Sequence, residues 1–221
     1  MKIAFLTIAT NKYIQYAENL LSTLNDFAFK NTKHQVDLFV FTNIPELFRH
    51  RLMRINAHGI MTTHVPFPLV SLLRYHYYAS CDALKDYDYL YHIDCDMLMQ
   101  DVVSEEIFGD STCVIHPGFY GQNINPSHFP YDRASGSNAY VQPGIGTHYY
   151  QNCFQGGITT EFLNMCVKLR NDVEENLREV IYQEICDNLI LKYRMNGEAG
   201  EEAIGIDDIV IDDNNMILEN D

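Results

Sequence analysis

The stretch that most constrains the fold of this chain is residues 87–99, where an aromatic and apolar run of strand length ends in two aspartates, Asp94 and Asp96. Such a run suits a strand covered on both faces, as in the parallel sheet of an α/β protein. Ligands of open α/β sheets bind outside the carboxyl ends of the strands. Two carboxylates at that edge offer hard oxygen ligands to Mg2+ or Mn2+ that already carries phosphates. Asp-x-Asp alone is more typical of a solvated acidic turn, and only its position after a buried strand favours a metal site.

The first 42 residues predict a βαβ unit. Residues 2–9 form an apolar run, residues 13–29 carry apolar side chains at helical spacing, and residues 36–42 form a second apolar run. Strand, helix and strand in that order imply a parallel sheet. Asn11 could cap the helix. Tyr13 could stack on a base if the loop after the first strand binds a nucleotide, although an aromatic residue that starts a helix is also typical of a core position.

The rest of the chain predicts further alternation of helices and strands, and therefore an α/β fold with a mixed, mostly parallel sheet flanked by helices. The expected elements are a helix over 45–57, a short strand over 60–65, a helix over 69–84, a strand over 86–99, a strand over 113–121 that breaks at Pro117, a helix over 159–177 and a further helical run to about Tyr193.

Arg74, His92 and Cys95 lie in or next to these elements. Arg74 lies in an amphipathic helix, where an arginine either forms a structural ion pair or reaches a site to hold a carboxylate or phosphate. We expect His92 to be a satisfied core histidine that points away from the neighbours of Asp94, and Cys95 to pack into the core.

Composition limits the class of protein. At 221 residues and 47% apolar content the chain has room for one domain with a sizeable core, and a net charge of −15 argues against nucleic-acid binding. Nine acidic residues and no basic one lie in residues 197–221. We therefore expect a single catalytic domain over residues 1–196 and a mobile acidic tail over 197–221.

The sequence also predicts a cytoplasmic, soluble protein. No apolar run approaches the roughly 18 residues that span a bilayer, and the first strand begins without a preceding signal peptide. The six cysteines are dispersed, which favours reduced thiols.

Residues 122–146 are rich in Asn, Pro, Ser and Gly but also contain Phe129, Tyr131 and Tyr140. A long loop within a compact domain is usually functional or disordered, and its aromatic residues favour function. The glycines that follow, Gly156 and Gly157, let the backbone approach a ligand or a neighbouring strand closely.

Several motifs together have the order and spacing of one known family. They are residues 9–13 with the helix that follows, 36–42, 71–74, Ile-Asp-Cys-Asp over 93–96, His-Pro-Gly-Phe-Tyr-Gly over 116–121, Tyr-Asp-Arg over 131–133, Ser-Asn-Ala-Tyr over 137–140, and 149–157. The histidine motif, about 20 residues after Asp-x-Asp, is the most specific of them. On these motifs residues 1–170 resemble glycosyltransferase family 6, which includes the blood-group A and B transferases and α-1,3-galactosyltransferase. The chain looks like a soluble microbial or viral-type member without the membrane anchor.

The resemblance implies the GT-A nucleotide-sugar transferase fold and retaining transfer of Gal or GalNAc from a UDP-sugar to a glycan with a terminal galactose, in α-1,3 linkage. It also implies Mn2+, or Mg2+, bound by Asp94 and Asp96. The positions that it assigns to substrates are Ile8, Ala9, Thr10 and Tyr13 for uracil and ribose, Arg74 for the donor sugar and the first aspartate, Asp94, Cys95 and Asp96 for the diphosphate and its metal, His116 for the acceptor, and Gln151, Asn152 and Cys153 for the choice of donor sugar and for acceptor contacts.

The segment that supplies the catalytic carboxylate departs from the family pattern. The family has Trp-His-Asp-Glu-Ser-His about 30 residues after the paired glycines, whereas this chain has Tyr-Gln-Glu-Ile-Cys-Asp-Asn-Leu over residues 182–189. Counting forward from Gly157 aligns Asn188 with the catalytic Glu, and counting back from Lys192 aligns Asp187 with it. We expect Asp187 to be the carboxylate, with Glu184 on the same helix face as an alternative. Both residues also fit ordinary acids of a helix surface.

The C-terminal segment departs as well. In the family a basic tail closes over the diphosphate, whereas an acidic tail would repel it. A site left open to water loses its protection against hydrolysis, so we expect notable UDP-sugar hydrolysis. The alternative function is a UDP-sugar or glycan-binding protein with a decayed catalytic segment. The sequence leaves the preferred donor, the acceptor and the oligomeric state open.

Overall fold

A computed structural model describes residues 1–120 and 124–195, with Arg51 and residues 178–195 described by their backbone alone. The chain divides into two compact units, Met1–Arg178 and Glu179–Asp221. The sheet and the site described below belong to the first unit. The predicted acidic tail over 197–221 lies outside the described residues, so its mobility and the domain boundary at residue 196 stay predictions.

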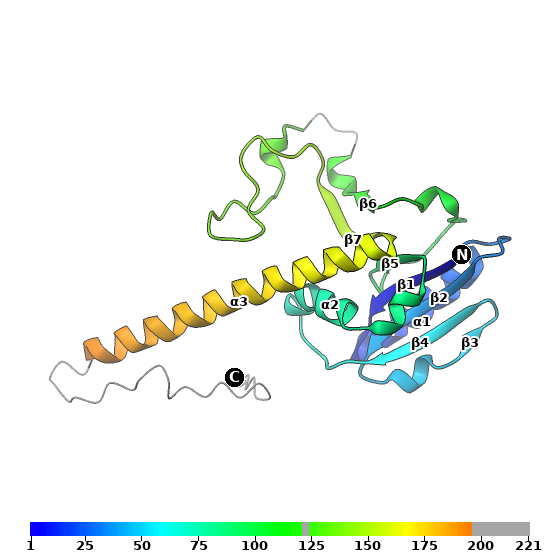
Figure 1. The fold of residues 1–221 in the computed structure, drawn as a ribbon, viewed down its shortest axis with the longest axis horizontal. Coiled ribbons are helices and arrows are strands. Elements are labelled where there is room, and N and C mark those ends of the chain that lie inside the picture. Colours follow the sequence, from blue (N-terminus) through cyan, green and yellow to red (C-terminus); the bar gives the residue numbers. More distant parts are fainter. Residues whose placement is uncertain (121–123, 196–221) are drawn as a thin grey trace. The chain divides into compact units, whose positions relative to one another are not determined.

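The first unit is built on a mixed sheet of seven strands in the order β3-β4-β2-β1-β5-β7-β6 (Figure 1). The strands are β1 (Lys2–Ile8), β2 (Gln35–Thr42), β3 (Arg51–Leu52), β4 (Ile55–Met61), β5 (Tyr89–Ile93), β6 (Thr112–Ile115) and β7 (Tyr150–Ile158). The neighbours β4, β2, β1 and β5 are parallel, while β3 and β7 pair antiparallel with β4 and β5. The predicted α/β class with a mostly parallel mixed sheet is confirmed.

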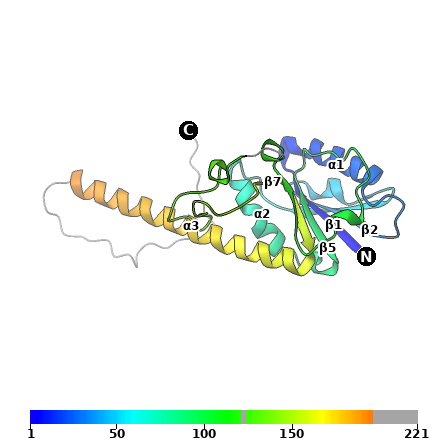
Figure 2. The same cartoon turned by 90° about the horizontal axis from the view of Figure 1, so that it is seen from above.

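Helices cover both faces of the sheet: α1 (Ile14–Phe27) lies on one, and α2 (Leu69–Ala79) with the first turns of α3 (Thr159–Met195) on the other (Figure 2). Alternation along the strands supplies both cores. On β1, Phe5 belongs to the cluster that contains Leu20 of α1, and Leu6 to the cluster that contains Tyr78 of α2 and Phe162 of α3. The predicted βαβ unit and helix over 159–177 are therefore confirmed, and the helical run after 177 continues α3.

The predicted helix over 45–57 is wrong, and the strand predicted over 60–65 is misplaced, because β4 shares only residues 60 and 61 with it. A 3-10 turn, η2 (Pro45–Phe48), is followed by β3 and β4, and β4 ends at Met61. Tertiary packing overrides helical spacing here, because β4 pairs with β2 and the carbonyl of Pro45 lies against Gly59. A Cβ at residue 59 would lie 2.0 Å from that carbonyl oxygen, so the position requires glycine.

Three other elements are shorter than predicted. Strand β6 ends at Ile115 instead of residue 121, and a 3-10 turn, η5, follows it over Pro117–Phe119. Helix α2 ends at Ala79 instead of residue 84, with a separate 3-10 turn η3 over Asp82–Asp86. Its C-cap is Ser80, a residue that competes with helix by local hydrogen bonding. Strand β5 covers only Tyr89–Ile93 of the predicted 86–99, so Asp94 begins the loop that follows it. Within the described part of the chain, no helix is both long and apolar enough to cross a membrane.

Candidate functional site at the carboxyl edge of the sheet

The candidate site is centred on Asp94, the first residue after β5. Because β1 and β5 are parallel neighbours, the loop after Ile8 leaves the sheet at the same edge. Strand β7 is antiparallel to β5, so it starts where β5 ends. The backbone N–H of Asp94 donates to the carbonyl of Cys153 at 2.9 Å. The fold therefore brings the Asp-x-Asp segment and the predicted donor-selecting residues together.

Arg74 joins these two segments from α2. Its Nη1 lies 3.5 Å from Oδ1 of Asp94 and donates to the carbonyl oxygen of Asn152 at 3.4 Å. The side chain is only 8% exposed. Its Nε is buried without a hydrogen-bond partner among the described residues. A buried guanidinium held at one end and unsatisfied at the other is costly unless it binds something. Arg74 thus forms an ion pair with Asp94, and the interpretation in which it also holds a substrate group stays a prediction.

The expectation that His92 points away from the neighbours of Asp94 is wrong. Its Nε2 lies 3.0 Å from Oδ1 of Asp94, because residues two apart in a strand share a face. Its Nδ1 lies 2.8 Å from the hydroxyl of Tyr78, and Arg74 contacts Nε2. The other half of the expectation holds, because His92 is buried and both ring nitrogens have partners. Strand alternation alone would have placed His92 and Asp94 on the same face. Tyr78 follows Arg74 by four residues in α2, so the two side chains share one face of that helix.

Asp94 is held as a carboxylate. Burial acts to raise its pKa, but the hydrogen bond from His92 and the charge of Arg74 outweigh that effect, and the pKa lies below its ordinary value. Burial lowers the pKa of His92, which keeps the imidazole neutral. Asp94 is partly exposed and Asp96 is exposed, so both carboxylates are open to a ligand.

These carboxylates suit a hard divalent cation. The described residues contain no cluster of three or more His, Cys, Asp or Glu side chains arranged around one point. Mg2+ that is bound together with a nucleotide usually has one or two carboxylate ligands. Phosphate oxygens and water fill its remaining coordination positions. The hydrogen bonds described above engage Oδ1 of Asp94, so within the described part of the chain Oδ2 is open to such an ion. Cys95 is buried in the core as expected, and burial raises its thiol pKa to about 12.

The loop after β1 forms the other end of the site. Ala9 is buried and donates from its backbone to the carbonyl of Phe41, and Thr10 is buried beside His64, with 2.7 Å between Thr10 Oγ1 and His64 Nδ1. Tyr13 is 40% exposed.

Asn11 does not cap α1: it lies in a 3-10 turn with positive φ, and the side-chain amide of Asn43 donates to it. Sequence patterns gave no indication of His64.

Among the predicted donor-selecting residues, Gln151 is half-buried, Asn152 exposed and Cys153 buried. The side-chain amide of Gln155 donates to Asn152 Oδ1 at 3.1 Å and to the hydroxyl of Tyr75 at 3.2 Å. The carboxamide oxygen of Asn152 is thus engaged by Gln155 of the same strand, and Gln155 in turn contacts Tyr75 of α2. Burial raises the pKa of Cys153, so its thiol is not a nucleophile at neutral pH.

His116 belongs to an aromatic cluster in the long loop. Its ring centroid lies 5.8 Å from that of Tyr149, and Phe119, Phe129 and Tyr131 also pack around Tyr149. The backbone N–H of His116 donates to the carbonyl of Tyr149, which joins the end of β6 to the start of β7. The described part of the loop therefore has a small core of its own. The carboxylates Asp187 and Glu184 fall in α3, but their side chains lie outside the described residues.

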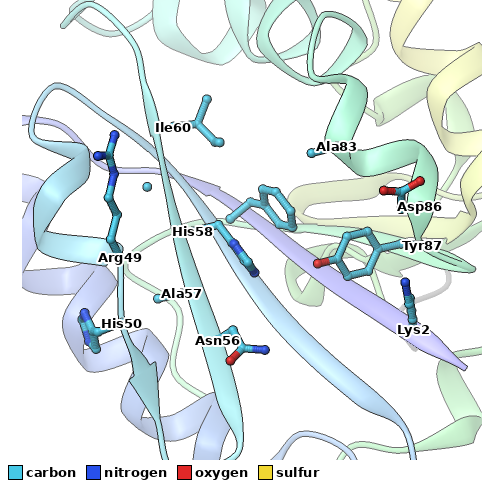
Figure 3. Close-up of a pocket in the computed structure, with 12 residues that line it drawn as sticks. Lys2, Arg49, His50, Asn56, Ala57, His58, Ile60, Ala83, Asp86 and Tyr87 are labelled. Atoms are coloured by element: carbon cyan, nitrogen blue, oxygen red, sulfur yellow. The ribbon is translucent and has the colours of Figure 1, made fainter.

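A separate groove of about 680 Å3 lies toward the amino ends of the strands (Figure 3). It is lined in part by His58 and Tyr87, which both bond to the carboxylate of buried Asp37. Burial acts to raise the pKa of Asp37, but hydrogen bonds from four side chains lower it from 3.8 to about 2. Asp37, already satisfied by four donors, is a structural centre, and the exposed Asp86 also lines the groove.

Comparison with known proteins gives a consistent result. The model of glycosyltransferase family 6 matches residues 1–188. The chain is 25% identical to globoside alpha-1,3-N-acetylgalactosaminyltransferase 1 of Gallus gallus, over 75% of this chain and 50% of the relative. It is 27% identical to histo-blood group ABO system transferase 2 of Rattus norvegicus, over 72% and 48%. It is 25% identical to the O-antigen biosynthesis glycosyltransferase WbnI of Escherichia coli, over 66% and 64%. The chain thus spans about half the length of the animal relatives.

Proposed function

The chain belongs to glycosyltransferase family 6, and we propose that it transfers Gal or GalNAc from a UDP-sugar to a galactosyl acceptor with retention, forming an α-1,3 linkage. The observation that carries this proposal is the joining of Arg74, Asp94 and Asn152 at the carboxyl edge of the sheet. The names of relatives that transfer N-acetylgalactosamine support the choice of sugar.

Asp94 and Asp96 would hold Mn2+ or Mg2+ together with the diphosphate. When bound, the cation neutralises negative charge on the departing UDP. Arg74 would orient the donor sugar against Asp94. Uracil and ribose would lie on residues 8–13, where the backbone of Ala9 is fixed by Phe41 and Tyr13 is open for stacking. Gln151, Asn152 and Cys153 would select the sugar.

The acceptor would lie against the aromatic cluster around His116. A galactose ring has an apolar face that packs on aromatic side chains, and the polar edge of His116 can bond to its hydroxyl groups. The chain has no tryptophan, so Tyr and Phe must supply this surface.

A carboxylate must stabilise the oxocarbenium-like sugar on the face opposite the leaving group. We assign this role to Asp187, with Glu184 as the alternative. The substitutions Asp187→Asn and Glu184→Gln separate the two.

Hydrolysis of the UDP-sugar is part of the proposal. The acidic segment over 197–221 would be repelled by a diphosphate, so water would reach the donor more easily than under a basic lid. UDP release with and without lactose measures the balance. We expect a substantial rate without lactose, and a large excess of transfer over hydrolysis with lactose present would contradict this part of the proposal.

The alternative is a UDP-sugar or glycan-binding protein, and the altered segment over 182–189 is the feature that favours it. Calorimetry with UDP in Mn2+, and again in EDTA, tests the donor site that both functions share. We expect binding that requires the metal. Tight binding with no turnover of any UDP-sugar would favour the binding protein, and absence of binding in Mn2+ would contradict both.

A further inference from the structure

We propose that Tyr78 and His92 form a hydrogen-bond relay that positions Asp94, fixing which of its two carboxylate oxygens is presented to the metal and diphosphate. This inference rests on the proposed function, because it concerns the same site. It assigns positioning roles to two residues that do not themselves reach the substrate.

Tyr78 and His92 of the relay are buried, and only Asp94 reaches the surface. Tyr78 is fully buried and His92 is 2% exposed, whereas the side chain of Asp94 is 37% exposed. The Tyr78 hydroxyl is 2.8 Å from Nδ1 of His92, and Nε2 of His92 is 3.0 Å from Oδ1 of Asp94. Two buried polar side chains thus connect the core beneath α2 to the first residue of the exposed Asp-x-Asp loop.

The direction of the hydrogen bonds follows from the groups involved. A carboxylate only accepts, so the 3.0 Å contact with Asp94 requires the proton on Nε2 of His92. A neutral imidazole then offers Nδ1 as an acceptor, and the hydroxyl of Tyr78 donates to it.

Arg74 also contacts Nε2 of His92, and it would donate there if the ring carried its proton on Nδ1 instead. The guanidinium has two other acceptors within reach, the carboxylate of Asp94 and the carbonyl of Asn152. Oδ1 of Asp94 and Nε2 of His92 would then face each other as two acceptors, which is unfavourable. With the proton on Nε2, His92 donates to Asp94 and accepts from Tyr78, and Arg74 donates to Asp94 and to the carbonyl of Asn152. The contact of Arg74 with Nε2 is then one between two donors, so it is not a hydrogen bond.

As a consequence, the two oxygens of the Asp94 carboxylate have different roles. The protein holds Oδ1 through His92 and Arg74, and Oδ2 is left for a ligand. Groups that orient a metal ligand in this way typically change metal affinity or activity by about 10- to 100-fold when removed. Arg74 contacts the same oxygen at 3.5 Å, whereas Nε2 of His92 lies 3.0 Å from it, so His92 makes the shorter of the two contacts.

The first test is nitrogen-15 NMR of the full chain labelled on histidine, with the signals of His92 identified by their loss in His92→Gln. We expect a protonated Nε2 and an unprotonated Nδ1 at neutral pH. A proton on Nδ1 would overturn the relay. This measurement on the unaltered chain does not depend on whether a Tyr78 variant folds.

The second test measures binding of MnCl2 in saturating UDP by the electron paramagnetic resonance of free Mn2+. Tyr78→Phe removes only the hydroxyl, and Tyr77→Phe is the matched control, because Tyr77 stacks on Phe41 outside the relay. We expect about tenfold weaker binding in Tyr78→Phe and no change in the control. Equal binding by wild type and Tyr78→Phe would overturn the relay alone, whereas no binding by wild type would overturn the proposed metal site as well.

Discussion

The guanidinium of Arg74 lies 3.5 Å from the carboxylate of Asp94, at the one edge of the sheet where the predicted donor-binding segments meet. Replacing Arg74 by Gln would remove a buried charge that contacts the carboxylate and that, in the proposed function, orients the donor sugar. We expect kcat/KM for the UDP-sugar to fall about 100-fold, equivalent to roughly 2.7 kcal/mol. Arg170→Gln, a partly exposed arginine of α3, should change it less than twofold. Equal effects of the two substitutions would contradict the role of Arg74.

Asp37 should make the free energy of unfolding depend on pH in the acidic range. Its pKa of about 2 in the folded chain lies below the ordinary 3.8, so folding favours the charged form. The resulting stabilisation, about 2 kcal/mol, is complete above the ordinary pKa and is lost as pH falls from about 4 towards 2. Urea unfolding of wild type and Asp37→Asn should therefore show a stability difference that shrinks by about 1 kcal/mol between pH 7 and pH 3. A difference that is independent of pH would contradict this.

Gly156 should tolerate no side chain. A Cβ there would lie 2.2 Å from the carbonyl oxygen of Leu90 and 2.7 Å from Cα of Tyr91, so β5 and β7 would have to separate. We expect Gly156→Ala to destabilise the fold by about 3 kcal/mol. Gly136→Ala is the control, because nothing lies within 4 Å of its Cβ position. Thermal unfolding of both variants measures the difference, and similar melting temperatures would show that the strands can adjust.

Asp187 and Glu184 can be separated by turnover. We expect Asp187→Asn to lower kcat for transfer at least 100-fold with little change in the affinity for UDP, because the carboxylate acts on the sugar in the transition state. Glu184→Gln should change kcat less than fivefold. The reverse ranking would move the role to Glu184, and unchanged rates in both would exclude this segment from catalysis.

Local patterns predicted most of the sheet. Strands β1, β2 and β5 are buried on both faces. Their sequences are therefore continuous apolar runs, and such runs can be recognised without the structure. Residues 45–57 were mispredicted because the pairing of β4 with β2 and its contact with Pro45 are set by other parts of the chain.

Within the site, sequence motifs identified residues but did not predict the contacts between them. The pattern identified Arg74, Asp94 and Asn152, but only the fold shows that one guanidinium reaches both others. Tyr78 and Gln155 were missed because they act through His92 and Asn152, and their helix or strand positions alone resemble ordinary core residues. Correct use of strand alternation would have placed His92 beside Asp94 from the sequence.

The most direct test of the central claim is UDP release from a panel of UDP-sugars with lactose present, in Mn2+ and in EDTA, for wild type, Asp94→Asn and Asp96→Asn. We expect turnover of UDP-Gal or UDP-GalNAc that requires the metal and falls at least 100-fold in both variants. A disaccharide product with an α-1,3-linked sugar should form alongside it. Turnover in EDTA equal to that in Mn2+, or full activity in both variants, would contradict the assignment of Asp94 and Asp96 as the donor and metal site.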